Sequence, residues 1–166
     1  MTRLLRLWRH LSSSRRSARR LFPHTTLQAI QASIADGESR HRAEVRVVIE
    51  AALPLASVWQ GHGARARAHE LFSHYRLWDT EDNSGVLVYL NLADHKIEIV
   101  PDRSVGRALK PADWQSICAT MSAGFARAAY HDSVLAALTQ LHTLLAQHYP
   151  RSGPQHNQLS DRPLML

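Results

Sequence analysis

Three polar stretches of the sequence contain side chains of the types that bind hard divalent cations. They are Glu38–His41–Glu44, Thr80–Asn83–Gly85 and the single residue Asp102. Carboxylate, amide and hydroxyl oxygens are the ligands that Ca²⁺ and Mg²⁺ prefer in proteins. If the fold brings the stretches together, they predict a site for Ca²⁺ or Mg²⁺. The expected ligands are Glu44, Asn83 and Asp102, with weaker candidates at Glu38, His41, Thr80 and Ser84. The alternative is ordinary turn and capping chemistry, which uses the same residue types.

Three predicted strands flank these stretches. The first spans 43–51, with Val45, Val47 and Ile49 on one side. The second, 86–92, is apolar almost throughout and is therefore expected to be buried on both faces. A tight turn at 93–95 joins it to a third strand at 96–100, which predicts an antiparallel hairpin.

The connection between the first two strands decides where the polar stretches lie. A predicted helix at 64–75 separates these strands, which favours a parallel pair with a right-handed crossover. The starts of both strands and the end of the third then share one end of the sheet. Glu44, Asn83 and Asp102 are therefore predicted to lie together there.

Further helices are predicted after Pro23, after Pro111 and from a cap at Asp132 to Pro150. Together with the strands they predict an α/β fold, a three-layer α/β/α sandwich with a small mixed sheet. The expected organisation is a basic arginine-rich arm at 1–22, an α/β domain at 23–150 and a loose polar tail at 151–166.

The positive charge is concentrated in the arm. Residues 1–22 hold seven arginines and no acid, which leaves 13 basic residues against 14 acidic ones in the rest of the chain. A nucleic-acid-binding domain normally spreads a basic patch over its fold. This distribution therefore argues against a nucleic-acid partner.

The start of the arm has the pattern of a basic amphipathic helix. Leu4, Leu7, Trp8 and Leu11 would share one face, and arginines would cover much of the rest. This predicts contact with an anionic lipid surface and an arm dispensable for folding. The residues expected at the membrane surface are Arg3, Arg6, Leu7, Trp8 and Arg9. Two alternatives stay open, a solvated flexible tail and an organellar targeting peptide.

The sequence also limits where the protein can reside and which catalytic or metal-binding motifs it can use. No apolar run approaches the roughly 20 residues that span a bilayer, and charges interrupt any signal-peptide core. A cytoplasmic protein, peripheral at the inner membrane, is expected. The loop at 79–85 is not an EF-hand, because its glycine comes one place late and Leu90 replaces the required glutamate. The sequence contains no P-loop, GxGxxG, GxSxG or HExxH motif.

Several segments resemble the TPM domain family. They are TEDNSGVLVYL at 80–90, HKIEIVPDRS at 95–104, Trp114 and the closing His148, Tyr149 and Pro150. ESRHRAEVR at 38–46 and RLWRHL in the arm are similar to the short soluble bacterial branch of that family. The family includes phosphatase-like proteins of the thylakoid and photosystem-repair type. The resemblance covers about residues 22–150.

The resemblance implies an α/β/α sandwich, a divalent cation held in an acidic cleft and, in some members, weak phosphatase activity. It also implies a LemA-type membrane protein as partner, since bacterial relatives are often found alongside such proteins. The sequence departs from the family pattern at Ser84, where asparagine is common, and at Pro101 and Ser104, which flank the Asp-Arg pair.

These observations favour an accessory or interaction module linked to the cell envelope. The alternative is a metal-dependent phosphatase-like hydrolase. Such an enzyme needs positive charge for the phosphoryl group, which Arg103 and a cation could supply. It also needs a nucleophile or an activated water, and no dedicated nucleophile stands out.

Overall fold

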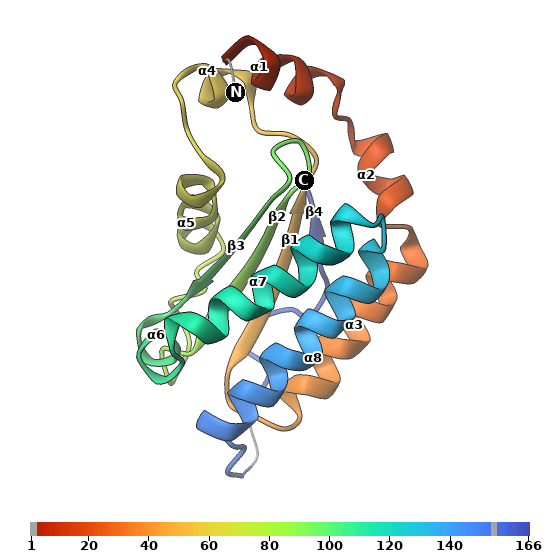
Figure 1. Ribbon diagram of the computed structural model, residues 1–166. Helices are drawn as coiled ribbons and strands as arrows, with labels where there is room; N and C mark the ends of the chain where they lie inside the picture. The colour runs from red at the N-terminus through yellow and green to blue at the C-terminus, as the bar shows by residue number, and fades with distance from the viewer. Residues whose placement is uncertain (1–2, 154–155) are drawn as a thin grey trace.

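The computed structural model describes residues 3–153 and 156–166 of the chain. Its elements, labelled in Figure 1, are α1 (Arg3–Ser12), α2 (Arg15–Leu21), α3 (His24–Glu38), β1 (Glu44–Glu50), α4 (Leu55–Trp59), α5 (Ala64–His74), β2 (Gly85–Asn91), β3 (Lys96–Pro101), α6 (Arg103–Ala108), α7 (Pro111–Ala126), α8 (Tyr130–His148) and β4 (Leu164–Met165). No helix among the described residues is both long and apolar enough to cross a membrane.

The strands form one mixed sheet in the order β3-β2-β1-β4. β1 and β2 are parallel, with Glu44 opposite Gly85, and β2 and β3 form the antiparallel hairpin. Every residue of β2 is buried, as its apolar sequence predicts. The predicted mixed sheet is therefore confirmed, with α5 in the crossover between β1 and β2.

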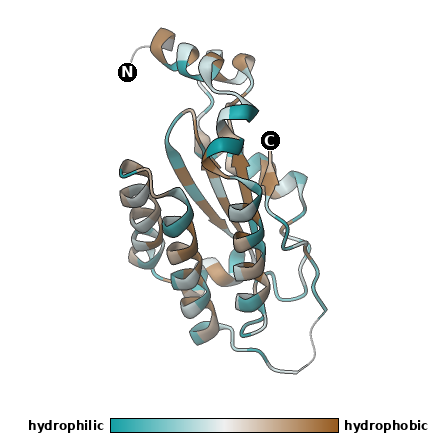
Figure 2. Cartoon of the chain, turned by 90° about the vertical axis from the view of Figure 1, so that its right-hand side faces the viewer, coloured by the Kyte–Doolittle hydropathy of each residue, from teal (hydrophilic) through white to brown (hydrophobic). Residues whose placement is uncertain are grey.

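Helices cover both faces of the sheet, which confirms the α/β/α sandwich (Figure 1). On one face, α3, α7 and α8 pack over the inward side chains of β1 and β2, including Val45, Val47 and Val88. On the other, α5 packs over Val48 and Tyr89. Figure 2 shows the apolar strands enclosed between these helices. The sequence does not predict three short helices, α2, α4 and α6.

The polar composition of residues 151–166 predicts a loose tail, but its last three residues pair with the sheet. Leu164 and Met165 pair in parallel with Val48 and Ile49 of β1. The N–H of Leu166 also donates to the carbonyl of Ile49 at 2.9 Å. The outer side of β1 offers backbone groups that need partners, and an apolar pair near the end of the tail satisfies them.

The N-terminal segment is helical and packs against the domain. Phe22, which the sequence-based boundary assigns to the arm, is fully buried in the core, with its ring edge-on to Phe125 and Tyr130. Arg6, expected at a lipid surface, instead binds Asp94 in the turn after β2. Leu7 is half-buried, and the side chain of Arg3 lies outside the described part of the structure.

Candidate functional site

The strand register brings the three principal predicted ligands to one end of the sheet. Glu44 begins β1 opposite Gly85, the first residue of β2, and Asn83 lies two residues before Gly85. The N–H of Asp102, just after β3, donates to the carbonyl of Gly85 at 2.7 Å. The crossover topology predicted this placement from sequence alone. Their role as metal ligands stays a prediction.

Several of these groups take part in local hydrogen bonds. Asp102 caps α6, where its Oδ1 accepts the N–H of Arg103 at 2.7 Å. Thr80 Oγ1 accepts the N–H of Ser84 at 2.9 Å, and Asn83 occupies the left-handed region with φ of 49°. The Oδ2 atom of Asp102, however, is buried without a hydrogen-bond partner. Turn and capping chemistry therefore explains much of this cluster, but not that atom.

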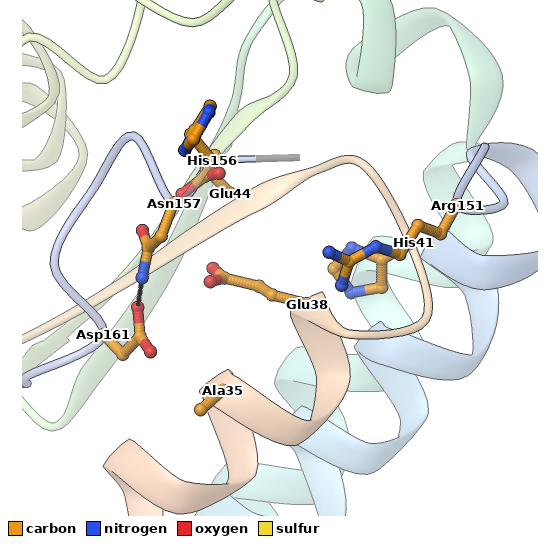
Figure 3. Close-up of a pocket in the computed structure, with 8 residues that line it drawn as sticks. All are labelled: Ala35, Glu38, His41, Glu44, Arg151, His156, Asn157 and Asp161. Carbon is orange, nitrogen blue, oxygen red and sulfur yellow. Dashed lines mark hydrogen bonds between the residues drawn. The ribbon is translucent and has the colours of Figure 1, made fainter. Parts of the chain in front are cut away.

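A separate acidic cavity of about 190 Å³ lies where the end of α3, the start of β1 and the C-terminal segment meet (Figure 3). It is lined by Ala35, Glu38, His41, Glu44, Arg151, His156, Asn157 and Asp161. Three predicted residues, Glu38, His41 and Glu44, are thus brought together here. Asn83 and Asp102 do not line this cavity.

Glu38 extends from the last turn of α3 into the cavity (Figure 3). Its Oε1 accepts the N–H of Val45 at 2.7 Å. Burial raises the pKa of the Glu38 carboxyl to about 9, although the Val45 hydrogen bond opposes the shift. The charges of Glu44 and Asp161 and a hydrogen bond with Asp161 raise this pKa further. Glu38 therefore retains its proton at neutral pH.

Glu44 ties the C-terminal segment to β1. Its Oε1 and Oε2 accept the backbone N–H groups of Gln158 and Leu159, at 3.3 and 3.1 Å. Burial raises the pKa of Glu44, these two hydrogen bonds lower it, and the charge of Asp161 raises it. The cavity therefore disfavours negative charge on two neighbouring carboxyl groups, which is a condition that a bound cation would relieve.

The substitution Glu38→Gln should stabilise the protein at pH 8 and have little effect at pH 4.5. A carboxyl pKa raised by folding favours the native state at low pH, and this contribution is lost as the pH rises toward 9. Glutamine mimics the protonated carboxyl and removes the penalty. We expect a gain of about 1–2 kcal/mol in unfolding free energy at pH 8, measured by urea denaturation.

The matched control is Asp36→Asn on the same helix, where the carboxylate is exposed and pairs only with Arg40 across one turn. It removes the same charge without burial and should change stability by less than about 0.5 kcal/mol. Equal stability of the Glu38→Gln variant and the original protein at pH 8 would show that Glu38 is ionised in the cavity.

Two buried histidines form the wall behind the cavity. His41 Nε2 lies 2.7 Å from Nδ1 of His142 on α8, and the two rings stack with centroids 5.0 Å apart. Both side chains are fully buried. Burial lowers the pKa of His41 to about 4 and that of His142 to about 3, and Arg40 adds to both shifts. Both imidazole rings are therefore neutral at pH 7, and a single hydrogen bond joins Nε2 of His41 to Nδ1 of His142.

Sequence reasoning missed the two components of this site that come from far along the chain. His142 lies 101 residues from His41, and neither has a partner at helical spacing that would mark a motif. Asp161 and His156 fall in the segment predicted to be loose. Among the described residues, no three His, Cys, Asp or Glu side chains are arranged to hold a metal ion.

Comparisons with known proteins agree with this architecture. Residues 17–144 match the TPM domain family. The structure is similar to the NMR structure of the BA42 protein from the psychrophilic bacterium Bizionia argentinensis, with a TM-score of 0.75 and 18% sequence identity. The similarity covers 85% of this chain and 92% of BA42, and at this identity it shows a shared fold. No curated protein matches the sequence.

Proposed function

The chain belongs to the TPM domain family, and from this premise we propose that it is an accessory module of the cell envelope that binds a divalent cation in its acidic cavity. The observation that carries the cation proposal is that the carboxyl groups of Glu38, Glu44 and Asp161 line one cavity, where burial and the neighbouring charges raise the pKa of Glu38 to about 9. A carboxyl group kept protonated by burial and by neighbouring carboxylates is a position where a cation can replace the proton.

The cavity contains donor types that suit a hard cation, although its carboxylates are not arranged in this structure to hold one. Glu38, Glu44 and Asp161 offer carboxylate oxygens, and Asn157 offers an amide oxygen, which are ligand types that Ca²⁺ and Mg²⁺ share. Both carboxylate oxygens of Glu44 already accept hydrogen bonds from N–H groups of the C-terminal segment. Binding would therefore require this segment to shift, so that cation affinity and the position of the segment are coupled.

An accessory role is favoured over phosphoester hydrolysis by the side chains in the cavity. Its lining holds three carboxyl groups against one arginine, so it offers little of the positive charge that a phosphoryl group requires. The second arrangement to consider is the predicted set Glu44, Asn83 and Asp102, because the buried Oδ2 of Asp102 lacks a hydrogen-bond partner. Both candidate sites include Glu44, but Glu38 belongs only to the acidic cavity and Asp102 only to the predicted set.

Millimolar Ca²⁺ or Mg²⁺ should raise the melting temperature, and the rise should be larger at pH 8.5 than at pH 6. An ion that binds only the folded state stabilises it by mass action, by about 2.7 kcal/mol at 100 times Kd. Protons compete for Glu38 below its pKa of about 9, so acid weakens binding. Differential scanning fluorimetry with each metal and with EDTA measures the effect.

Two variants locate the ion. Glu38→Gln should abolish the metal-dependent rise if the ion occupies the acidic cavity, whereas Asp102→Asn should leave it. The reverse result would assign the ion to the predicted set around Asp102. No rise with any divalent cation would exclude both sites, and metal-dependent turnover of a generic phosphomonoester would favour the hydrolase.

The envelope link also predicts a protein partner. A LemA-type membrane protein is the partner that the family resemblance implies, and a pull-down from native extract with the full chain as bait tests it directly.

A further inference from the structure

The first helix, α1, is amphipathic, but it turns its polar face toward the domain and its apolar face outward. Its polar side chains Arg6 and His10 face the domain, whereas four of its large apolar side chains are exposed: Leu4, Leu5, Trp8 and Leu11. A surface helix normally buries its apolar stripe and exposes its charges. The reversed orientation of α1 therefore presents an apolar face with no partner in the described structure.

A network of polar contacts fixes this orientation. The guanidinium of Arg6 binds Asp94 through Nε at 2.9 Å and Nη2 at 2.7 Å, and also donates to the carbonyl of His62. His10 is 3% exposed, and its Nδ1 accepts the N–H of Leu53 at 3.0 Å. Since Nδ1 is the acceptor, Nε2 carries the proton and donates to Asp94 at 3.1 Å. Rotating α1 to bury its leucines would break every one of these contacts.

α4 packs beside α1 (Figure 1) and also carries exposed apolar side chains. We call the exposed apolar side chains of these two helices the apolar platform. Its members and their exposed fractions are Leu4 75%, Leu5 59%, Trp8 72%, Leu11 64%, Leu55 44% and Trp59 68%. In the described residues the remaining exposed large apolar side chain is Trp78. An exposed cluster of this kind marks a binding surface.

The charge around the platform identifies its occupant. α2 follows α1 after two serines and carries four exposed arginines, Arg15, Arg16, Arg19 and Arg20. The first acidic residue of the chain is Asp36. Leucine and tryptophan side chains beside arginines suit the boundary between the acyl chains and the anionic headgroups of a lipid bilayer. A second copy of the same surface would bring like charges together.

We propose that the apolar platform is a preformed surface for an anionic membrane, on which α1 and α4 lie in the plane of the lipid interface. The surface differs from a flexible basic arm, because Arg6 holds α1 to the domain and α4 supplies a second tryptophan. Binding is shallow and reversible, since the platform is short and no helix within residues 3–153 and 156–166 could cross a bilayer. This inference deepens the proposed envelope link and does not depend on the cation.

Co-sedimentation of the full chain with lipid vesicles in EDTA tests the proposal. We expect binding to vesicles of phosphatidylcholine with one quarter phosphatidylserine, and about tenfold weaker binding to phosphatidylcholine alone or in 0.5 M NaCl. The combined variant Leu4→Ser, Trp8→Ser and Leu11→Ser should also bind about tenfold more weakly. These side chains are exposed, so the variant keeps its fold, which circular dichroism checks.

The control is Trp78→Ser, which removes a tryptophan that is 52% exposed and lies near the start of β2, at the other end of the sheet from Asp94. It should bind like the original protein. Equal binding to neutral and anionic vesicles, or undiminished binding of the triple variant, would overturn the proposal. It would also be overturned by a concentration-dependent dimer that the triple variant loses, without any vesicle binding.

Discussion

Acidification from pH 7 to pH 4 should remove several kcal/mol of stability through the buried histidine pair alone. His41 and His142 have folded pKa values of about 4 and about 3, well below the ordinary value of 6.5. A base with a depressed pKa stabilises the native state above pH 6.5, and that contribution is lost as the pH falls toward 3. Each histidine contributes at most about 1.4 kcal/mol per pH unit. Urea denaturation across this pH range measures the slope.

The variant His142→Gln isolates this effect. It removes one buried imidazole but leaves an amide near His41, so the slope of unfolding free energy with pH between 6.5 and 4 should fall by roughly half. The control His69→Gln alters an exposed histidine on α5 and should leave the slope unchanged. An identical slope in His142→Gln and the original protein would show that other groups govern acid unfolding.

Gly37→Ala should destabilise the protein by about 2–4 kcal/mol, although alanine normally stabilises a helix interior. A Cβ atom at residue 37 would lie 2.1 Å from Nδ1 of His142. The ring cannot yield cheaply, because it is fully buried and stacked on His41. The midpoint of urea unfolding, at unchanged m-value, measures the loss.

Gly106→Ala on α6 provides the comparison. Its Cβ would meet only Pro101, at an ordinary contact distance of 3.5 Å, so this substitution should be neutral or stabilising. Equal stability of both alanine variants would mean that the His142 ring moves aside freely and that the pair is not rigid.

The sequence predicts the sheet because its signals there are local and consistent. The apolar run of β2 and the tight turn before β3 define the hairpin, and the intervening helix makes β1 and β2 parallel. From these elements alone, Glu44, Asn83 and Asp102 are assigned to the same end of the sheet, where the structure has them. Topology therefore positions polar residues even when no motif identifies them.

The features that sequence reasoning misses depend on contacts between distant residues. Helical periodicity shows that α1 is amphipathic, but it does not show which face turns inward. That choice is made by Asp94, which lies 88 residues from Arg6 and binds it. The tail is predicted to be loose because β4 is a strand of two residues, which is too short to have a detectable period.

Both edges of the sheet carry features that discourage pairing with additional strands. At one margin, β4 and Leu166 occupy backbone groups of Val48, Ile49 and Ala51 that would otherwise offer a template for another chain. At the other, β3 ends in a proline, and Arg65 donates to the carbonyl of Ile99 at 2.7 Å. Unprotected margins of apolar sheets promote aggregation between molecules. The short last strand thus contributes to colloidal stability, because it shields the most apolar part of β1 from pairing with a neighbouring molecule.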